Sequence, residues 1–217
     1  MKLDKDTYGT VLLVYLVCAV AIFLLLRFVS PWWIKWPLTL ALLWISGWQT
    51  YFHMVPDREA TGDENHVSAV SDGKGIRIEQ VYEPGYLKRD AWLISVYMDF
   101  WDLHANFWPV TGTVSYTEYF PGKHLLAFKP KASEENEHCC TAIRTKSGSE
   151  VLFKQLAGGF ARRIVCHAEI GQPVLAGDQC GIIKFGSRID YYLPLEARIC
   201  VQVGELVKAV HSIIAEI

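Results

Sequence analysis

Two long apolar runs open the chain, and shorter runs of alternating apolar and polar residues follow them. Residues 11–26 contain no charged residue, and a second apolar stretch extends over residues 36–52. A helix needs about 20 apolar residues to cross a bilayer, a length that the first run reaches if Arg27 extends its charge to the interface. We therefore predict a polar N-terminus over residues 1–9 and a membrane helical hairpin over residues 10–53, which either crosses the bilayer or dips into one face.

The connection between the two runs has the composition of a membrane interface. Trp32, Trp33 and Trp36 cluster there beside Lys35, and indole rings and lysine side chains favour the headgroup region. A cleavable signal peptide is one alternative, but a second apolar run follows and no small-residue cleavage site separates the two. Two core helices of a water-soluble domain are another, which the lengths and the tryptophan cluster disfavour.

From residue 67 onward the hydrophobic period changes to that of β-strands. Residues 54–66 are polar and rich in turn formers, so we predict a linker there. Short runs then recur between Gly, Pro, Asp and Ser residues, which is typical of a mainly β barrel or sandwich, here an α+β soluble domain over residues 67–217. The expected strands are 75–81, 91–98, 112–120, 125–129, 140–145, 150–156, 164–168, 181–185, 187–193 and 197–203. We also expect short helices at residues 100–106 and 155–163, and either a strand or a frayed helix at residues 205–217.

Charge and cysteine usage exclude two classes of function. The 217 residues carry a formal net charge of −2 and no basic patch interleaved with aromatic residues, so we expect no nucleic-acid partner. The six cysteines form no Cys-x-x-Cys pair, so the sequence offers no zinc pattern and we expect no metal. The chain is not a small disulfide-rich domain. We therefore expect reduced thiols and a soluble domain that faces the cytoplasm. The apolar hairpin predicts a location at the cell membrane.

The run Gly181–Pro194 contains an unusual step, Gly186–Ser187, inside an apolar strand pattern. Glycine weakens a strand interior and usually marks a bulge or a close backbone approach. Because glycine has no side chain, its carbonyl is the least hindered one that the Ser187 hydroxyl can attack. The step is therefore either a β-bulge without chemistry or a site at which Ser187 attacks its own preceding peptide bond.

Residues 181–194 resemble the self-cleavage segment of the short-form phosphatidylserine decarboxylase proenzymes. Other segments also resemble this family and follow in the family's order, so the ordered set is specific although each piece is short. Together they cover roughly residues 50–205. They read Ser-Asp-Gly-Lys-Gly at 71–75, Ile-Ser-Val-Tyr-Met at 94–98, Asp-Leu-His-Ala-Asn at 102–106, Pro-Val-Thr-Gly at 109–112, Lys-Pro-Lys-Ala-Ser at 129–133, Asn-Glu at 136–137, Gln-Leu-Ala-Gly at 155–158 and Ala-Arg-Arg-Ile-Val at 161–165.

The resemblance implies a self-processing enzyme of phospholipid biosynthesis. Ser187 would attack the Gly186 carbonyl, and elimination and hydrolysis would leave chains 1–186 and 187–217, with a pyruvoyl group at the start of the second. The pyruvoyl ketone would form a Schiff base with phosphatidylserine and accept electrons while CO2 leaves, which yields phosphatidylethanolamine. The implied cofactor is this pyruvoyl group, with no metal and no diffusible cofactor. The implied partners are phosphatidylserine, membrane lipid and the two cleavage chains as a heterodimer, with a higher oligomer left open.

Two further residues match family positions for proton transfer. His104 resembles the family histidine that transfers protons, with a histidine bonded to the backbone as the alternative. Asp72 resembles the acidic member of an Asp-His-Ser relay, with an Asp-Gly turn residue as the alternative. Longer family members carry a second histidine at the position of Phe107, so the base for self-cleavage is either His104 or another residue. The other histidine candidates are His124, His138 and His167.

Cationic side chains are expected to bind the phosphodiester and the carboxylate of such a substrate. Arg162 and Arg163 precede a strand, where one of two consecutive side chains points inward, and Arg188 adjoins the reactive serine. Arginine binds phosphate through paired hydrogen bonds. The alternative for each arginine is a solvated surface charge.

Two other functions remain open on the sequence alone. Residues 171–178 resemble a segment of lipoyl-like or efflux-adaptor modules, so a non-enzymatic, membrane-anchored β domain is one alternative. That alternative gives no role to residues 185–188 or to the Asp-x-His-x-Asn segment. The other alternative keeps the decarboxylase and changes the substrate to a related phosphoserine lipid.

Overall fold

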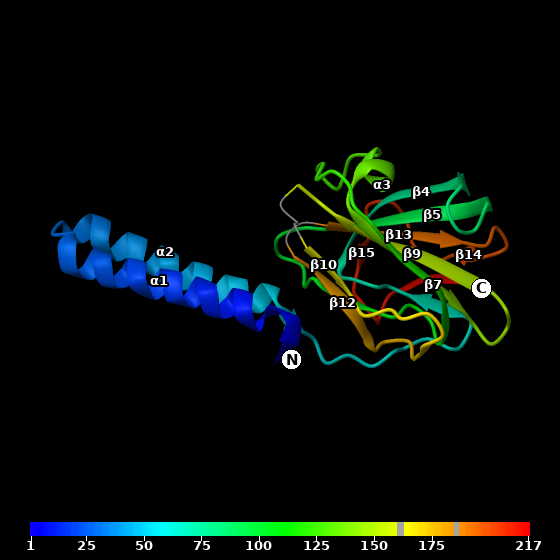
Figure 1. Ribbon diagram of the computed structural model, residues 1–217, viewed down its shortest axis with the longest axis horizontal. Helices are drawn as coiled ribbons and strands as arrows, with labels where there is room; N and C mark the ends of the chain where they lie inside the picture. Colours follow the sequence, from blue (N-terminus) through cyan, green and yellow to red (C-terminus); the bar gives the residue numbers. More distant parts are fainter. Residues whose placement is uncertain (160–162, 185–186) are drawn as a thin grey trace. The chain divides into compact units, whose positions relative to one another are not determined.

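The computed structural model describes residues 1–159, 163–184 and 187–217, with the backbone alone at Arg163. The chain forms two compact units, Met1–Asp57 and Arg58–Ile217. We call them the helical unit and the β unit (Figure 1).

The helical unit is an antiparallel hairpin of two helices. Its elements are β1 (Lys2–Leu3), η1 (Lys5–Thr7), α1 (Tyr8–Phe28), α2 (Trp32–Phe52) and β2 (Met54–Val55). β1 and β2 pair antiparallel and close the open end of the hairpin. A hydrogen bond between the Tyr15 hydroxyl of α1 and the Thr50 hydroxyl of α2 links the two helices. The predicted N-terminal helical hairpin is therefore confirmed.

The helix α1 is apolar around its whole circumference. Within the described residues, one helical segment, Lys5–Phe28, is long and apolar enough to cross a membrane by length and composition. Leu12 and Phe23 are 70% and 65% exposed, which suits contact with lipid tails better than contact with water. In α2, the hydroxyls of Ser46 and Thr50 donate to carbonyl oxygens four residues earlier. Such bonds satisfy polar groups inside the helix, as an apolar environment requires.

The described part of the β unit contains three antiparallel sheets that curl around a common interior (Figure 1). The eight-stranded sheet has the order β11-β7-β8-β9-β13-β5-β4-β15, and the two three-stranded sheets have the orders β10-β12-β6 and β14-β16-β3. The strands are β3 (His66–Ser68), β4 (Gly73–Glu83), β5 (Arg89–Met98), β6 (Ala105–Phe107), β7 (Gly112–Phe120), β8 (His138–Arg144), β9 (Glu150–Ala157), β10 (Arg163–Cys166), β11 (Pro173–Val174), β12 (Gln179–Lys184), β13 (Ser187–Leu193), β14 (Arg198–Ile199), β15 (Leu206–Val207) and β16 (Ile213–Glu216). The mainly β class expected from the sequence is confirmed.

The strand β13 lies inside the largest sheet and is buried on both faces. It pairs with β5 on one side and with β9 on the other, and each of its residues is buried. Successive side chains of a strand point to opposite faces. Ile189 and Tyr191 therefore join the main core, whereas Tyr192 joins a smaller cluster on the other face with Leu93 and Leu152. We call these the inner and the outer face.

The two short helices expected at residues 100–106 and 155–163 of the β unit are wrong within the described residues. Residues 105–107 form β6, which pairs with β12, and residues 155–157 continue β9 beside β13. Strand pairing on both sides overrides the helix-forming composition of Gln-Leu-Ala. Residues 125–129 form a loop instead of a strand, and residues 132–135 form the short helix α3 (Ala132–Glu135). At residues 205–217 two short strands replace the strand-or-helix alternative.

Candidate active site

Ser187 is the first residue of β13, and its side chain is fully buried. Its backbone pairs with Met98 of β5 and with Ala157 of β9, and its Oγ lies 3.6 Å from the Met98 sulfur. β12, which ends at Lys184, belongs to a three-stranded sheet, whereas β13, which begins at Ser187, belongs to the eight-stranded sheet. The other predicted cleavage residue, Gly186, lies outside the described residues.

His104 is buried at the end of the loop over residues 99–104, and the backbone fixes the orientation of its ring. Its Nδ1 lies 2.9 Å from the carbonyl oxygen of Asp102. Because a carbonyl oxygen can only accept, Nδ1 carries the hydrogen in this contact, which leaves the lone pair on Nε2 when the ring is neutral. The contact with the backbone and a catalytic role are therefore compatible, since this hydrogen bond makes Nε2 the basic nitrogen.

The 99–104 loop brings His104 and Ser187 to the same end of the β unit. The loop leaves β5 directly after Met98, which is the strand partner of Ser187. It ends at His104, whose carbonyl oxygen accepts a hydrogen bond of 3.2 Å from the backbone N–H of Ile183 in β12. The two ends of the loop are thus tied to the chain on either side of the predicted cleavage step.

Asp72 lies between β3 and β4 at this same end, and an arginine binds its carboxylate. Arg58 donates to both carboxylate oxygens, at 2.9 Å for Oδ2, and the Ala209 N–H donates to Oδ1 at 2.8 Å. A carboxylate offers about four acceptor positions, so Asp72 keeps acceptor capacity for a further donor. The sequence did not reveal Arg58, because this residue lies in the predicted linker and outside the short motifs that carried the resemblance.

Asp102 has a perturbed carboxyl group that the sequence reasoning missed. Burial raises the pKa of Asp102 to about 6, against the opposing hydrogen bond from the Asp99 N–H. The negative charges of Asp99 and Asp72 raise the same pKa further. Strongly shifted carboxyl groups are concentrated at functional sites. The signal in the sequence was the short spacing between Asp102 and His104.

Arg188, which we expected to bind substrate, is fully buried on the outer face and bound by protein groups. Its guanidinium donates to the carbonyl oxygens of Ala127 and Lys129 at 2.8 and 3.1 Å. It also forms an ion pair with Asp190, with Nε 2.8 Å from Oδ1, and donates to the Ser133 hydroxyl. Successive side chains of a strand point to opposite faces, so Arg188 points away from the face that Ser187 occupies. This geometry favours a structural role for Arg188, and its assignment to substrate binding stays an untested prediction.

The other two expected substrate-binding arginines fall at a gap in the described residues. Arg162 lies outside them, and Arg163 is described only as the first residue of the β10 backbone, opposite Lys184. β10 therefore runs beside the strand that leads toward Ser187. Their assignment stays a prediction.

His138 is separated from Ser187 by the central sheet. Its strand register, opposite Leu156, places it on the outer face with Arg188. There it lines a cavity of about 380 Å³ together with Lys154 and Tyr192. Burial lowers the pKa of His138. This position disfavours His138 as the base for self-cleavage.

The other two histidine candidates lie in loops. His124 lies 3.6 Å from the carboxylate of Glu137, and the His167 backbone N–H donates to the Cys180 carbonyl at 2.9 Å. Phe107 and Trp108 are buried, and Trp108 packs against Phe153. Of the four histidines considered, His104 has the placement best supported by described contacts around Ser187.

Comparison with known proteins assigns this chain to a family. A family model described as phosphatidylserine decarboxylase matches residues 45–215. The chain belongs to the phosphatidylserine decarboxylase family. A phosphatidylserine decarboxylase proenzyme of Amoebophilus asiaticus is 42% identical over 170 residues, which cover 78% of this chain and 76% of the relative. Proenzymes of the same name from Paraburkholderia phymatum and Burkholderia vietnamiensis are each 38% identical over 203 residues, which cover 94% of this chain and 93% and 92% of the relatives.

Membership in the phosphatidylserine decarboxylase family favours the enzyme over the adaptor alternative. The range matched by the family model includes Asp72, His104 and Ser187. Across the described part of the chain, no group of three or more His, Cys, Asp or Glu side chains is arranged to hold a metal ion. All six cysteines are free thiols.

Proposed function

We propose that this chain is a self-processing phosphatidylserine decarboxylase that cleaves itself between Gly186 and Ser187. The observation that carries the proposal is the placement of Ser187, which is buried at the start of the central strand and shares one end of the β unit with His104. The family assignment supplies the reaction class. The relatives' name, proenzyme, agrees with a precursor that is cut.

Self-cleavage begins with the Ser187 hydroxyl. Nε2 of His104 accepts the hydroxyl proton while Oγ bonds to the Gly186 carbonyl carbon. The proton then passes to the Ser187 nitrogen as the peptide C–N bond breaks, which gives an ester and a free amine. A base then removes the Ser187 α-hydrogen, and the Cβ–O bond breaks. This step leaves a carboxylate at Gly186 and an unsaturated residue at 187, which water converts to a pyruvoyl group with release of ammonia.

The two products of this cleavage are expected to stay together as a heterodimer. The small chain would contribute β13, which is hydrogen-bonded to β5 and β9 along its length. It would also contribute β15, which pairs with β4, and β16, which pairs with β3. Burial of β13 on both faces and these strand pairings stabilise the association without the peptide bond.

Residue 187 suits a pyruvoyl group because it is fully buried beside Met98 and Ala157, where little water reaches it. When present there, the group supplies a ketone that accepts the electron pair released as the substrate carboxylate departs. We propose that His104 Nε2 delivers a proton to the product. Arg162 and Arg163 remain the proposed ligands of the substrate phosphate.

The helical unit and the proposed substrate support a location at the cell membrane. The apolar segment Lys5–Phe28 is compatible with membrane association, and the proposed substrate is a membrane lipid. We propose that the β unit faces the cytoplasm, because its free thiols, which include the buried Cys139, Cys140 and Cys180, suit a reducing compartment.

Intact mass of the purified chain tests self-cleavage. We expect two chains, 1–186 and 187–217, with the second blocked at its N-terminus. Ser187→Ala should remain one chain without decarboxylase activity, because the attacking oxygen is gone. Ser95→Ala is the matched control, since Ser95 is a buried strand serine in the neighbouring β5 whose hydroxyl bonds Asp190 on the outer face. It should be processed normally.

A carbonyl-trapping reagent such as phenylhydrazine tests the ketone separately. Saturating reagent should abolish conversion of phosphatidylserine and add its mass to the small chain alone. A folded wild-type protein that stays full-length, or that keeps full turnover under saturating reagent, refutes the proposal.

A further inference from the structure

The loop over residues 121–131 exposes apolar side chains between lysines. Leu126 and Phe128 are 42% and 53% exposed, whereas Ala127 between them is buried. The loop contains Lys123, Lys129 and Lys131 and no acidic residue, and the three lysines are exposed. Lys123 also pairs with Glu135 of α3 at 2.9 Å. Exposed apolar side chains interleaved with lysines are the composition of protein surfaces that bind anionic membranes.

Hydrogen bonds hold this loop in the conformation that turns the apolar side chains outward. Arg188 binds the carbonyl oxygens on either side of Phe128, those of Ala127 and Lys129. The Asn136 side chain accepts from the Leu125 N–H at 2.9 Å and donates to the Leu125 carbonyl at 2.8 Å. The exposure of Leu126 and Phe128 is therefore fixed by buried polar groups and is not the result of a loose loop.

The same contacts place the loop at the end of the β unit that contains Ser187. Arg188 directly follows Ser187, and Asn136 also donates to the carbonyl oxygen of Ala157, the strand partner of Ser187. The ring of Phe128 packs edge-on against Tyr97, with centroids 6.1 Å apart.

The 99–104 loop adds aromatic side chains at this end. Phe100 and Trp101 are 40% and 63% exposed, and tryptophan favours the bilayer interface. They precede His104 in the loop that begins beside Ser187. Two loops from different parts of the sequence thus present exposed apolar side chains at the end of the β unit that contains Ser187.

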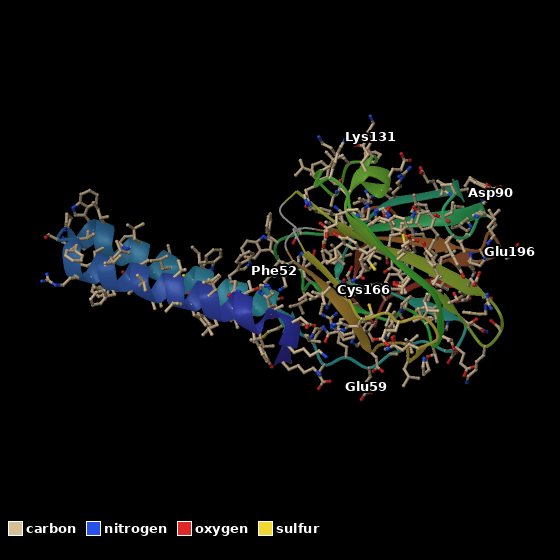
Figure 2. All side chains as sticks on the ribbon, in the orientation of Figure 1. Phe52, Glu59, Asp90, Lys131, Cys166 and Glu196 are labelled. Carbon is tan, nitrogen blue, oxygen red and sulfur yellow. The ribbon has the colours of Figure 1, made fainter. Side chains whose placement is uncertain are left out.

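We propose that these residues form a docking surface for an anionic phospholipid bilayer, separate from the apolar helix of the helical unit. The docking surface consists of Phe100, Trp101, Lys123, Leu126, Phe128, Lys129 and Lys131. Its apolar side chains enter the headgroup region, and its lysines contact lipid phosphates and carboxylates. The choice of an anionic bilayer rests on the proposed function, because phosphatidylserine is an anionic lipid and the surface lies at the same end of the β unit as the residue that would act on it. Figure 2 shows Lys131 at the outer edge of the β unit.

Photocrosslinking of the full chain in lipid nanodiscs tests the docking surface at single residues. Phe128→p-benzoyl-phenylalanine places a probe on the loop, and Tyr82→p-benzoyl-phenylalanine is the control. Tyr82 is a similarly exposed aromatic residue near the far end of β5, opposite Asp90, an end that Asp90 and Glu196 mark in Figure 2. In nanodiscs of phosphatidylcholine with phosphatidylglycerol, which is anionic but not a substrate, we expect lipid adducts at position 128 and few at position 82.

Charge reversal then tests the role of the lysines. Lys129→Glu with Lys131→Glu should lower the lipid adducts at position 128 at least about fivefold in anionic nanodiscs, and high salt should have a similar effect. Lys88→Glu with Arg89→Glu, at the far hairpin, should leave them unchanged. A probe at Leu126 gives a second, independent reading if the Phe128 variant folds poorly.

Three results would overturn the docking surface: equal lipid adducts at positions 128 and 82, adducts at 128 to protein instead of lipid, or no response to charge reversal. The readout is lipid contact in the absence of substrate, so it does not depend on decarboxylation. Intact mass of the same samples reports self-cleavage, so failure of the proposed function is seen separately.

Discussion

At the scale of single residues, neighbouring groups orient or bind the side chains of the candidate site. The Asp102 carbonyl fixes the His104 tautomer, and Arg58 binds the Asp72 carboxylate. Arg188 has a charge beside the reactive residue, yet its described contacts are all with protein groups. A charged residue next to a nucleophile is therefore not evidence of substrate binding when the strand turns it to the opposite face.

The Asp102 carboxyl group should make stability depend on pH. Its pKa rises from 3.8 to about 6 in the folded chain, so the folded state binds more protons than the unfolded state between these values. Stability attributable to Asp102 is therefore highest below about pH 4, falls as pH rises to about 6, and stays low above that. Asp102→Asn should stabilise the protein at pH 8 by about 1 kcal/mol, after discounting for the partial exposure of the group, and by nothing at pH 4.

Thermal unfolding of the two proteins in detergent at pH 4, 6 and 8 measures this difference. Asp90→Asn, which removes the same charge from an exposed hairpin, is the control and should show no such trend. A constant difference between Asp102→Asn and wild type across this range contradicts the prediction.

At the scale of elements, β12 has to approach β10 closely to carry the chain toward Ser187. Gly181 makes this possible, because a Cβ there would lie 2.1 Å from the Val165 carbonyl oxygen in β10 and 3.1 Å from the Gln155 amide nitrogen. Real Cβ atoms do not come that close to a backbone oxygen, so any side chain at this position separates the two strands.

Gly181→Ala should therefore destabilise the fold by about 2 kcal/mol, as overpacking does, and should slow self-cleavage. Displacement of β12 moves the Ile183 N–H that bonds the His104 carbonyl. Denaturant midpoints of the Ser187→Ala background measure the stability, and intact mass over time measures the cleavage. Gly47→Ala, whose Cβ would meet open space, should process at the normal rate. Normal processing of Gly181→Ala would show that β12 does not position the site.

At the scale of the whole molecule, the two compact units suggest separate tasks. The helical unit holds the long apolar segment, whereas all of the residues assigned to chemistry lie within Arg58–Ile217. The boundary keeps Arg58 with its partner Asp72 in the β unit.

A fragment of residues 58–217 should fold and cleave itself without the helical unit. It should give a β-type circular dichroism spectrum and the same small chain by mass. Full-length protein should require detergent for extraction from membranes, because its apolar helix contacts lipid. The fragment should be released by high salt, since it lacks the apolar helix and salt screens the attraction between the lysines of the docking surface and the lipid. An unfolded or uncleaved fragment would show that the units are not independent.

The sequence predicted the mainly β class and the helical hairpin, because alternating runs and long apolar runs are local signals. Ser187, His104 and Asp72 emerged from motifs, and the structure brings all three to one end of the β unit. Their role in chemistry stays a prediction. The contacts of Arg188 and Arg58 and the strand at residues 155–157 could not be predicted, because they depend on pairings with distant residues such as Asp190, Asp72 and Ser187.

The interior position of β13 has a consequence for how such an enzyme can be encoded. If the chain is cut before Ser187, the short product contains β13, a strand that lies between β5 and β9 in the sheet. Two separately translated polypeptides would have to open that sheet, or leave a gap in it, before they could meet. A single gene avoids this problem, because β13 pairs with β5 and β9 while all three strands still belong to one covalent chain. Gene fission at this point should therefore be much less tolerated than the scission that the folded protein performs on itself.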